Sequence, residues 1–174
     1  MPLVAMRRVH VAIMRRSWGL LEKILSGEKT IESRWYMQKS EPWESIDAGD
    51  IIYFKNSGAP VTLSASVDKV LQFERLNPKK VREILERFGA KDGLDVGEIE
   101  RYFYYFKHKH YCILIFLKDI QKVEPFDIDK TGFGARAAWI TVDDIDKIKK
   151  IKESSFRQRT LLKKTKQVNF QISN

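Results

Sequence analysis

The stretch Gly27-Glu28-Lys29-Thr30-Ile31-Glu32-Ser33-Arg34 joins a short amphipathic segment to an alternating one. Before it, apolar residues recur at three- and four-residue spacing, which predicts a helix that Ser17 caps and Gly27 ends. The apolar residues at this spacing are Trp18, Leu21, Ile24 and Leu25. The stretch therefore predicts a helix-to-strand junction.

Charged side chains gather at this junction. In a strand that starts near residue 30, the side chains of Thr30, Glu32 and Arg34 would share one face, because side chains alternate along a strand. Lys29 would lead onto the same face from the turn. Three charged groups and a hydroxyl so close together make the junction a candidate site.

A Gly-Asp turn, Ala48-Gly49-Asp50, follows and leads into the apolar strand segment Ile51-Ile52-Tyr53-Phe54. The order of short helix, G-x-K-x-x-E-x-R string, Gly-Asp turn and apolar strand resembles the ASCH domain, a branch of the PUA-like superfamily, of archaeal or bacterial type. The resemblance covers about residues 9 to 120. It implies a small mixed β-barrel flanked by helices, with a cleft at the helix-strand junction that binds RNA or modified nucleosides.

The remaining pattern predicts an α+β fold in the order βαβββααββ(β)α, which agrees with a small barrel. Period-2 or continuous apolar runs predict further strands at 8–14, 50–55, 61–67, 111–118 and 121–126, and a short strand before residue 141. The run at 111–118 reads as a central strand that is buried on both faces. The Gly-rich segment 130–140 is interpreted as a structural turn, since it lacks the context of a phosphate-binding loop.

Three further helices carry boundary signals. Asn77 caps and Pro78 begins one that stops at Gly89. Asp95 and Glu98 have capping-box spacing before a second helix, whose apolar stripe is Ile99, Phe103 and Phe106 with Tyr102 and Tyr105 beside it. Thr141 is predicted to cap a last helix that turns three side chains toward the core: Ile145, Ile148 and Ile151.

The composition indicates a soluble globular protein, with 43% hydrophobic and 32% charged residues in a chain of 174. This length predicts one domain at 1–152 and a basic tail at 153–174. The longest apolar run, 111–117, is far shorter than the roughly 20 residues that span a bilayer, so no membrane association is expected. Its lone Cys112 predicts a buried thiol rather than a disulfide, and we expect a cytoplasmic monomer.

The net charge of +9 is concentrated near the C-terminus. Residues 147–174 hold nine Lys and Arg and one acid, which leaves about +1 for residues 1–146. Such a segment is either a solvated tail or an electrostatic arm that binds phosphates without sequence preference. The tail residues that we include as candidate nucleic-acid contacts are Arg157, Arg159, Lys163 and Lys164.

The charged residues of the junction alone could be an ion-paired surface ladder, worth on the order of 0 to 1 kcal/mol per pair. Trp35, Tyr36 and Lys39 extend the same edge, however, and aromatic faces beside fixed cations are what an unpaired nucleotide requires. The sequence therefore favours an RNA-binding or nucleotide-binding module. The candidate contacts outside the tail are Lys29, Thr30, Glu32, Arg34, Trp35, Tyr36, Lys39, Lys55 and Arg136.

An enzyme is the alternative, with Lys29 and Glu32 as its catalytic candidates. The acetylcytidine amidohydrolases of this superfamily use a lysine, a threonine three residues later and a distal glutamate. The resemblance implies that residues at the matching positions of this chain would be catalytic. Lys29 matches the lysine, but Glu32 occupies the threonine position. No motif selects a counterpart of the glutamate among the charged residues of the expected region, which are Glu83, Glu86, Lys91 and Asp92.

Local electrostatics favour binding over hydrolysis. A catalytic Lys29 would need a lowered pKa, whereas a nearby Glu32 carboxylate favours the charged ammonium. A charged lysine would still suit a ribonuclease, because it stabilises a phosphorane-like transition state. A third alternative is a protein-interaction module in a transcription or translation assembly, which a cleft filled by its own side chains would favour.

No cofactor or metal is expected. His108 and His110 stand in a Lys-His-Lys-His run, which is typical of a basic helix end rather than of half a zinc site.

Overall fold

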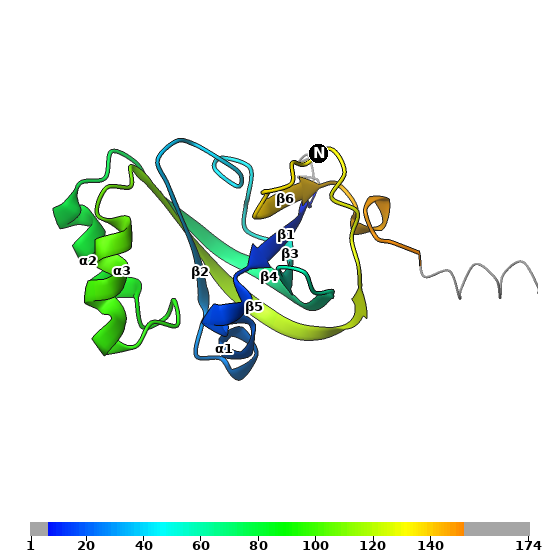
Figure 1. Cartoon of the computed structure of the whole chain (residues 1–174), viewed down its shortest axis with the longest axis horizontal. Coiled ribbons are helices and arrows are strands. Elements are labelled where there is room, and N and C mark those ends of the chain that lie inside the picture. Colours follow the sequence, from blue (N-terminus) through cyan, green and yellow to red (C-terminus); the bar gives the residue numbers. More distant parts are fainter. Residues whose placement is uncertain (1–6, 152–174) are drawn as a thin grey trace, which may run out of the picture.

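A mixed six-stranded sheet forms the centre of the protein, in a computed structural model that describes residues 7–151. The strand order is β2-β5-β4-β3-β1-β6. Neighbours pair antiparallel except β1 and β3, which are parallel. The sheet curves into a half-barrel (Figure 1), so the predicted α+β class with a small mixed barrel-like sheet is confirmed. The strands are β1 (Val9–Met14), β2 (Ile31–Tyr36), β3 (Ile51–Asn56), β4 (Val61–Phe73), β5 (Tyr111–Phe126) and β6 (Trp139–Val142).

Within residues 7–151, three α-helices flank the sheet. Figure 1 shows α2 (Pro78–Phe88) and α3 (Ile99–Phe106) side by side at one end, while α1 (Leu20–Ser26) lies near the start of β2. The boundary signals of α2 are confirmed, since the Asn77 side chain accepts from the Lys80 backbone N–H and Pro78 is the first helical residue. Short 3₁₀ turns occur at Arg16–Trp18, Val96–Glu98 and Ile145–Lys147.

The helix-strand junction lies between two parts of the core. Ile24 of α1 belongs to a buried cluster with Phe54 of β3 and Ile113 of β5. Ile31, the first residue of β2, belongs to a second cluster with Leu85 of α2 and Leu114 of β5. Both isoleucine side chains are fully buried. The core therefore holds the segment 25–30 at both of its ends, at Ile24 and at Ile31.

The predicted start of the first helix is wrong. Ser17 caps nothing, because it lies in the 3₁₀ turn Arg16–Trp18. Gly19 then takes a left-handed conformation with φ of 60°, and α1 begins only at Leu20. The left-handed residue interrupts the helical hydrogen bonding, which an apolar periodicity does not reveal. The predicted stop is correct, since Gly27 is left-handed with φ of 83°.

The two strands predicted at 111–118 and 121–126 are one strand, β5. Asp119 takes a positive φ of 52° between them without ending the pairing with β4. The strand β4 extends to Phe73, beyond its predicted end at residue 67. The long strand β5 pairs with it over these additional residues. Asp119 therefore accompanies a shift of register within β5 and does not end the strand.

The predicted last helix is also wrong. Thr141 belongs to β6, where it pairs with His10 of β1, so it is not a cap. Up to residue 151, where the description of the chain ends, only the 3₁₀ turn Ile145–Lys147 follows, and Lys149 then forms a β-bridge with Ile128. Ile148 is buried as predicted, but Ile151 is 72% exposed. The pairing of β6 with β1 and the bridge at Lys149 lie on either side of Ile145–Lys147, which limits the helical segment to one 3₁₀ turn.

A buried histidine gives the fold a pH dependence. His10 is fully buried, with Nε2 at 3.2 Å from Asp50 Oδ2, while the Trp139 indole donates to Nδ1 at 3.1 Å. Burial lowers the pKa of His10 below its ordinary value of 6.5, although Asp50 opposes this effect. Below pH 6.5 the unfolded chain therefore binds more protons than the native one, and stability falls.

We expect the unfolding free energy to decrease as the pH falls from 7 toward 5, by at most about 1.4 kcal/mol per pH unit from this one group. Urea denaturation of the wild type and His10→Gln across this range measures it. The variant should show a shallower pH slope, whereas His108→Gln, which changes an exposed histidine, should retain the wild-type slope. Equal slopes in all three proteins would contradict the assignment.

Candidate functional site at the helix-strand junction

The turn after α1 directs the Lys29 side chain into the protein. Gly27 ends the helix, and the Lys29 backbone N–H then donates to the Lys23 carbonyl at 2.9 Å. Lys29 is only 3% exposed. A lysine is almost never this buried unless its ammonium is paired, so its surroundings decide what it can do.

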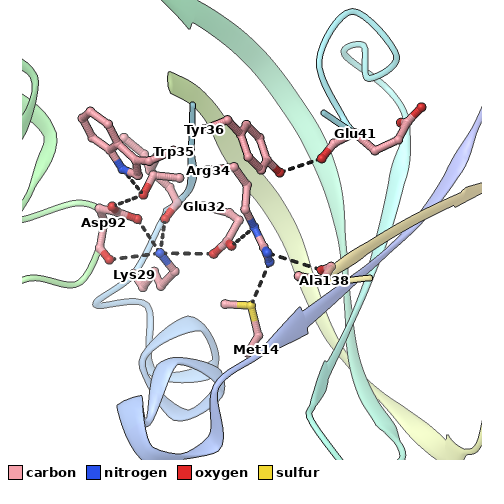
Figure 2. A network of polar contacts seen from close by, with 11 residues as sticks. Met14, Lys29, Glu32, Arg34, Trp35, Tyr36, Glu41, Asp92 and Ala138 are labelled. Atoms are coloured by element: carbon pink, nitrogen blue, oxygen red, sulfur yellow. Dashed lines mark hydrogen bonds and ion pairs between the residues drawn. The ribbon is translucent and has the colours of Figure 1, made fainter. Parts of the chain in front are cut away.

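The ammonium of Lys29 is surrounded by oxygen acceptors (Figure 2). It donates to the Ile31 carbonyl at 2.7 Å, the Asp92 carbonyl at 3.0 Å and Asp92 Oδ1 at 2.5 Å. Glu32 Oε2 lies 3.2 Å from the same nitrogen. Three hydrogen bonds use all three N–H groups of an ammonium, so Lys29 is held in one position.

Two carboxylates keep this lysine protonated. Burial by itself lowers the pKa of Lys29, but the negative charges of Asp92 and Glu32 and the hydrogen bond to Asp92 outweigh it, and the pKa is raised. Burial raises the pKa of Asp92, with Glu32 acting in the same direction and Lys29 opposing. The Lys29 ammonium is therefore a fixed cation and not a base at neutral pH, as the sequence predicts from the nearby Glu32.

Glu32 links this cation to a second one. Its Oε1 accepts from Arg34 Nε at 2.8 Å, because the two residues share a face of β2. The Arg34 guanidinium reaches across to the start of β6, where Nη1 donates to the Ala138 carbonyl at 3.3 Å and the group lies 5.1 Å from the Trp139 ring centre. Glu32 Oε2 is buried and accepts no hydrogen bond of good geometry.

Asp92 reaches Lys29 through the loop after α2. Gly93 has φ of +82°, and a Cβ there would lie 3.1 Å from Lys29 Cβ, so both its conformation and its neighbour favour glycine. Asp92 Oδ2 accepts from the Ser33 hydroxyl at 2.5 Å, and that hydroxyl oxygen accepts from the Trp35 indole at 3.1 Å. The four charges and Ser33 thus form one connected network.

A cavity of about 290 Å³ opens over this network. Aromatic side chains form its walls: the Trp35 ring is stacked on Phe106 of α3 at 4.7 Å, and Trp18 meets Tyr102 edge-on at 5.9 Å. Two further cations, Arg15 and Lys109, line it. The full lining is Ile13, Met14, Arg15, Trp18, Leu20, Lys29, Glu32, Ser33, Arg34, Trp35, Tyr36, Asp92, Leu94, Tyr102, Phe106, Lys109 and Ala138.

The structure brings five of the predicted site residues into this cavity, namely Lys29, Glu32, Arg34, Trp35 and Tyr36. The Tyr36 hydroxyl donates to the Glu41 carbonyl at 2.6 Å, and burial raises the pKa of Tyr36 to about 12. Thr30 does not join them. It precedes β2, is exposed and lies outside the cavity lining, so the predicted shared face holds only for Glu32 and Arg34.

Three other predicted contacts lie outside the cavity lining. Lys39 is exposed, 3.9 Å from Glu44, and Arg136 is exposed in the loop before β6. Lys55 is buried at β3, where burial and the nearby Lys130 lower its pKa. The candidates in the tail, which are Arg157, Arg159, Lys163 and Lys164, lie outside the described residues.

Sequence reasoning named Asp92 without selecting it, and it missed the roles of Ser33 and Phe106 in the site. Asp92 was one of four charged candidates without a motif, and the signal that distinguishes it is the following glycine, which allows the backbone to approach Lys29. Ser33 supplies the hydroxyl that was assigned to Thr30.

Within residues 7–151 there is no cluster of three or more His, Cys, Asp or Glu arranged to hold a metal ion. His108 and His110 are exposed. Cys112 is buried, and burial raises its pKa well above the ordinary value. No helix in the same range combines the length and apolar character needed to cross a membrane.

The fold has solved counterparts. An ASCH protein from Zymomonas mobilis superimposes with a TM-score of 0.55 and 18% sequence identity, over 88% of this chain and 94% of its own. The structure of a single-site variant of that protein gives the same TM-score and identity over 91% and 99% of the two chains. The protein therefore has an ASCH-like fold. No family model and no curated protein sequence matches the chain. At this level of identity the likeness establishes the fold alone.

Proposed function

We propose that this protein is an ASCH domain that binds RNA, or a modified nucleotide, through the cavity at the helix-strand junction. The observation that carries the proposal is a cavity whose floor is a fixed, charge-balanced network and whose walls are aromatic. Its volume of about 290 Å³ is at the lower limit of small-molecule sites. A single nucleobase with its sugar suits such a space.

The lining offers each part of a nucleotide a partner. Ring faces of the aromatic walls complement a base, because bases stack on aromatic side chains. Arg15 and Lys109 supply positive charge for a phosphate. A cavity filled by its own side chains would have favoured a protein-interaction module instead.

Arg34→Ala tests the proposal. We expect it to weaken the binding of free nucleoside monophosphates about 10- to 100-fold, since hydrogen bonds to charged groups contribute roughly 1.5–3 kcal/mol. Titration calorimetry with a panel of unmodified and acetylated nucleotides measures the affinity. Arg82→Ala is the matched control, because Arg82 pairs with Glu100 and is not among the cavity residues.

The two variants distinguish a nucleotide-binding site from a group of ion pairs that binds no ligand. If wild type and Arg34→Ala bind every nucleotide equally, or if Arg82→Ala loses affinity as well, the cavity is not the binding site. Thermal unfolding of each variant confirms that the fold is retained, so that a loss of binding reports on the contact.

A hydrolase is the second candidate, and one observation favours it. Asp92, a buried carboxyl with a raised pKa, lies beside Lys29, which supplies the lysine-carboxylate pair that resemblance to the acetylcytidine amidohydrolases implies. In that case the fixed positive charge of Lys29, whose three N–H groups are already donated, would stabilise a developing oxyanion electrostatically, and Asp92 would transfer a proton. Incubation with acetylcytidine and with labelled RNA tests it. Product formed by the wild type and absent with Asp92→Asn supports the enzyme, and no product from either substrate rejects it.

A further inference from the structure

The end of α3 and the residues that follow it carry a run of aromatic and basic side chains, only part of which faces the cavity. Residues 101–110 read RYFYYFKHKH, with five aromatic residues, three permanent cations, two histidines and no acid. Tyr102 and Phe106 line the cavity, and Phe103 packs under Arg82. Tyr104 and Tyr105, by contrast, are 69% and 52% exposed. Two exposed aromatic rings on a helix of eight residues form a surface feature that the cavity does not explain.

The exposed rings begin at the cavity wall. Successive residues turn by about 100° around a helix, so Tyr105 is adjacent to Tyr102, with Arg101 and then Tyr104 further around. The rings of Tyr102 and Tyr105 are in edge contact at 6.3 Å. At the other end of the run, Lys109 itself lines the cavity. The surface is therefore continuous with the candidate site.

Each exposed ring has its own cation. Lys107 Nζ lies 4.5 Å from the centre of the Tyr104 ring, and the Arg101 guanidinium lies 5.8 Å from that of Tyr105. A ring with a cation over one face suits a nucleotide, because a base can stack on the face that the cation leaves open while the cation meets the phosphate. Protein partners usually require an apolar centre that is depleted of charge, which this face does not have.

We propose that Arg101, Tyr104, Tyr105, Lys107 and Lys109 form a stacking platform for single-stranded RNA, on which the nucleotides next to the one in the cavity lie. This inference rests on the proposed function, since the cavity supplies the first nucleotide. It extends that function from recognition of a single nucleotide to binding of a strand, and it assigns the direction in which the strand leaves the cavity, across α3.

The test compares two ligands with three full-length proteins. The ligands are a nucleoside monophosphate and an end-labelled single-stranded RNA of random sequence, about ten nucleotides long, a length within the usual range of single-strand sites. The proteins are the wild type, the pair Tyr104→Ala with Tyr105→Ala, and the pair Tyr104→Phe with Tyr105→Phe. We expect the alanine pair to weaken RNA binding by at least about tenfold. The phenylalanine pair should retain RNA affinity, and nucleotide affinity should stay unchanged in all three.

The outcomes separate this inference from the proposed function. If nucleotides bind, and Arg34→Ala weakens that binding, but the alanine pair binds RNA as the wild type does, the platform is wrong and the cavity assignment stands. If the phenylalanine pair loses as much RNA affinity as the alanine pair, stacking is not the contact and the platform is again wrong. If the wild type binds neither ligand, both proposals fall.

Discussion

Lys29→Met is expected to lower the unfolding free energy by about 3–5 kcal/mol, the usual effect of removing one partner from a buried ion pair. The Lys29 ammonium, with 3% of the side chain exposed, is held by Asp92 and lies 3.2 Å from Glu32. Without it, two carboxylates remain buried against one remaining cation, Arg34. Methionine nearly fills the same volume, so the loss reports on charge rather than on a cavity.

The pH dependence identifies the cause. The raised pKa of Lys29 means that its contribution is fully present below about pH 10.5 and is lost only above the raised value, so the wild type gains nothing from it by acidification. In Lys29→Met, burial raises the pKa of Asp92, and no ammonium is left to lower it again. Its protonated form is then favoured, and stability is lost as the pH rises. The deficit of the variant should therefore be larger at pH 8 than at pH 5.

Chemical denaturation followed by circular dichroism measures both effects. Lys39→Met is the control, because Lys39 is an exposed lysine, and it should change stability by no more than about 0.5 kcal/mol. The double variant Lys29→Met with Asp92→Asn should recover part of the loss. A deficit that is the same at both pH values, or a double variant that loses the sum of the two single effects, would show that the pair is not coupled.

The part of the site that lies within residues 27–34 is predictable from the sequence. Gly27 fixes the end of α1, and the alternation of β2 places Glu32 and Arg34 on one face, so their ion pair follows from a spacing of two residues. The charged state of Lys29 also follows from its nearness to Glu32. The exception is Thr30, because one residue decides whether a side chain belongs to the turn or to the strand.

The contacts that residues far along the chain make with this segment are not predictable in the same way. Asp92 lies 63 residues from Lys29 along the chain, and only the packing of α2 against β2 and β5 brings them together. The same limit explains the wrong last helix. Thr141 and the three isoleucines have helical spacing, but β1 offers backbone hydrogen bonds that local periodicity does not show. Errors therefore occur where a distant segment overrides a local preference.

Trp35→Ala is expected to lower the unfolding free energy by about 3–5 kcal/mol, the usual range for truncating a buried aromatic side chain. Only 9% of Trp35 is exposed, and its ring stacks on Phe106 with an interplanar angle of 5°. It thus joins β2 to α3 across the wall of the cavity. Trp35→Phe keeps a ring against Phe106 but removes the indole N–H that bonds Ser33, so its effect should be smaller, about 1–2 kcal/mol.

Urea denaturation of both variants measures the difference, with the m-value held constant as the criterion that only stability has changed. A sequence-level interpretation treats Trp35 as a free surface for a base, and then its removal would alter binding without altering stability. In the structure the ring already has a partner, because Phe106 covers one of its faces. Equal stability of Trp35→Ala and the wild type would contradict the stacked wall and would restore the first interpretation, in which Trp35 is free to hold the ligand.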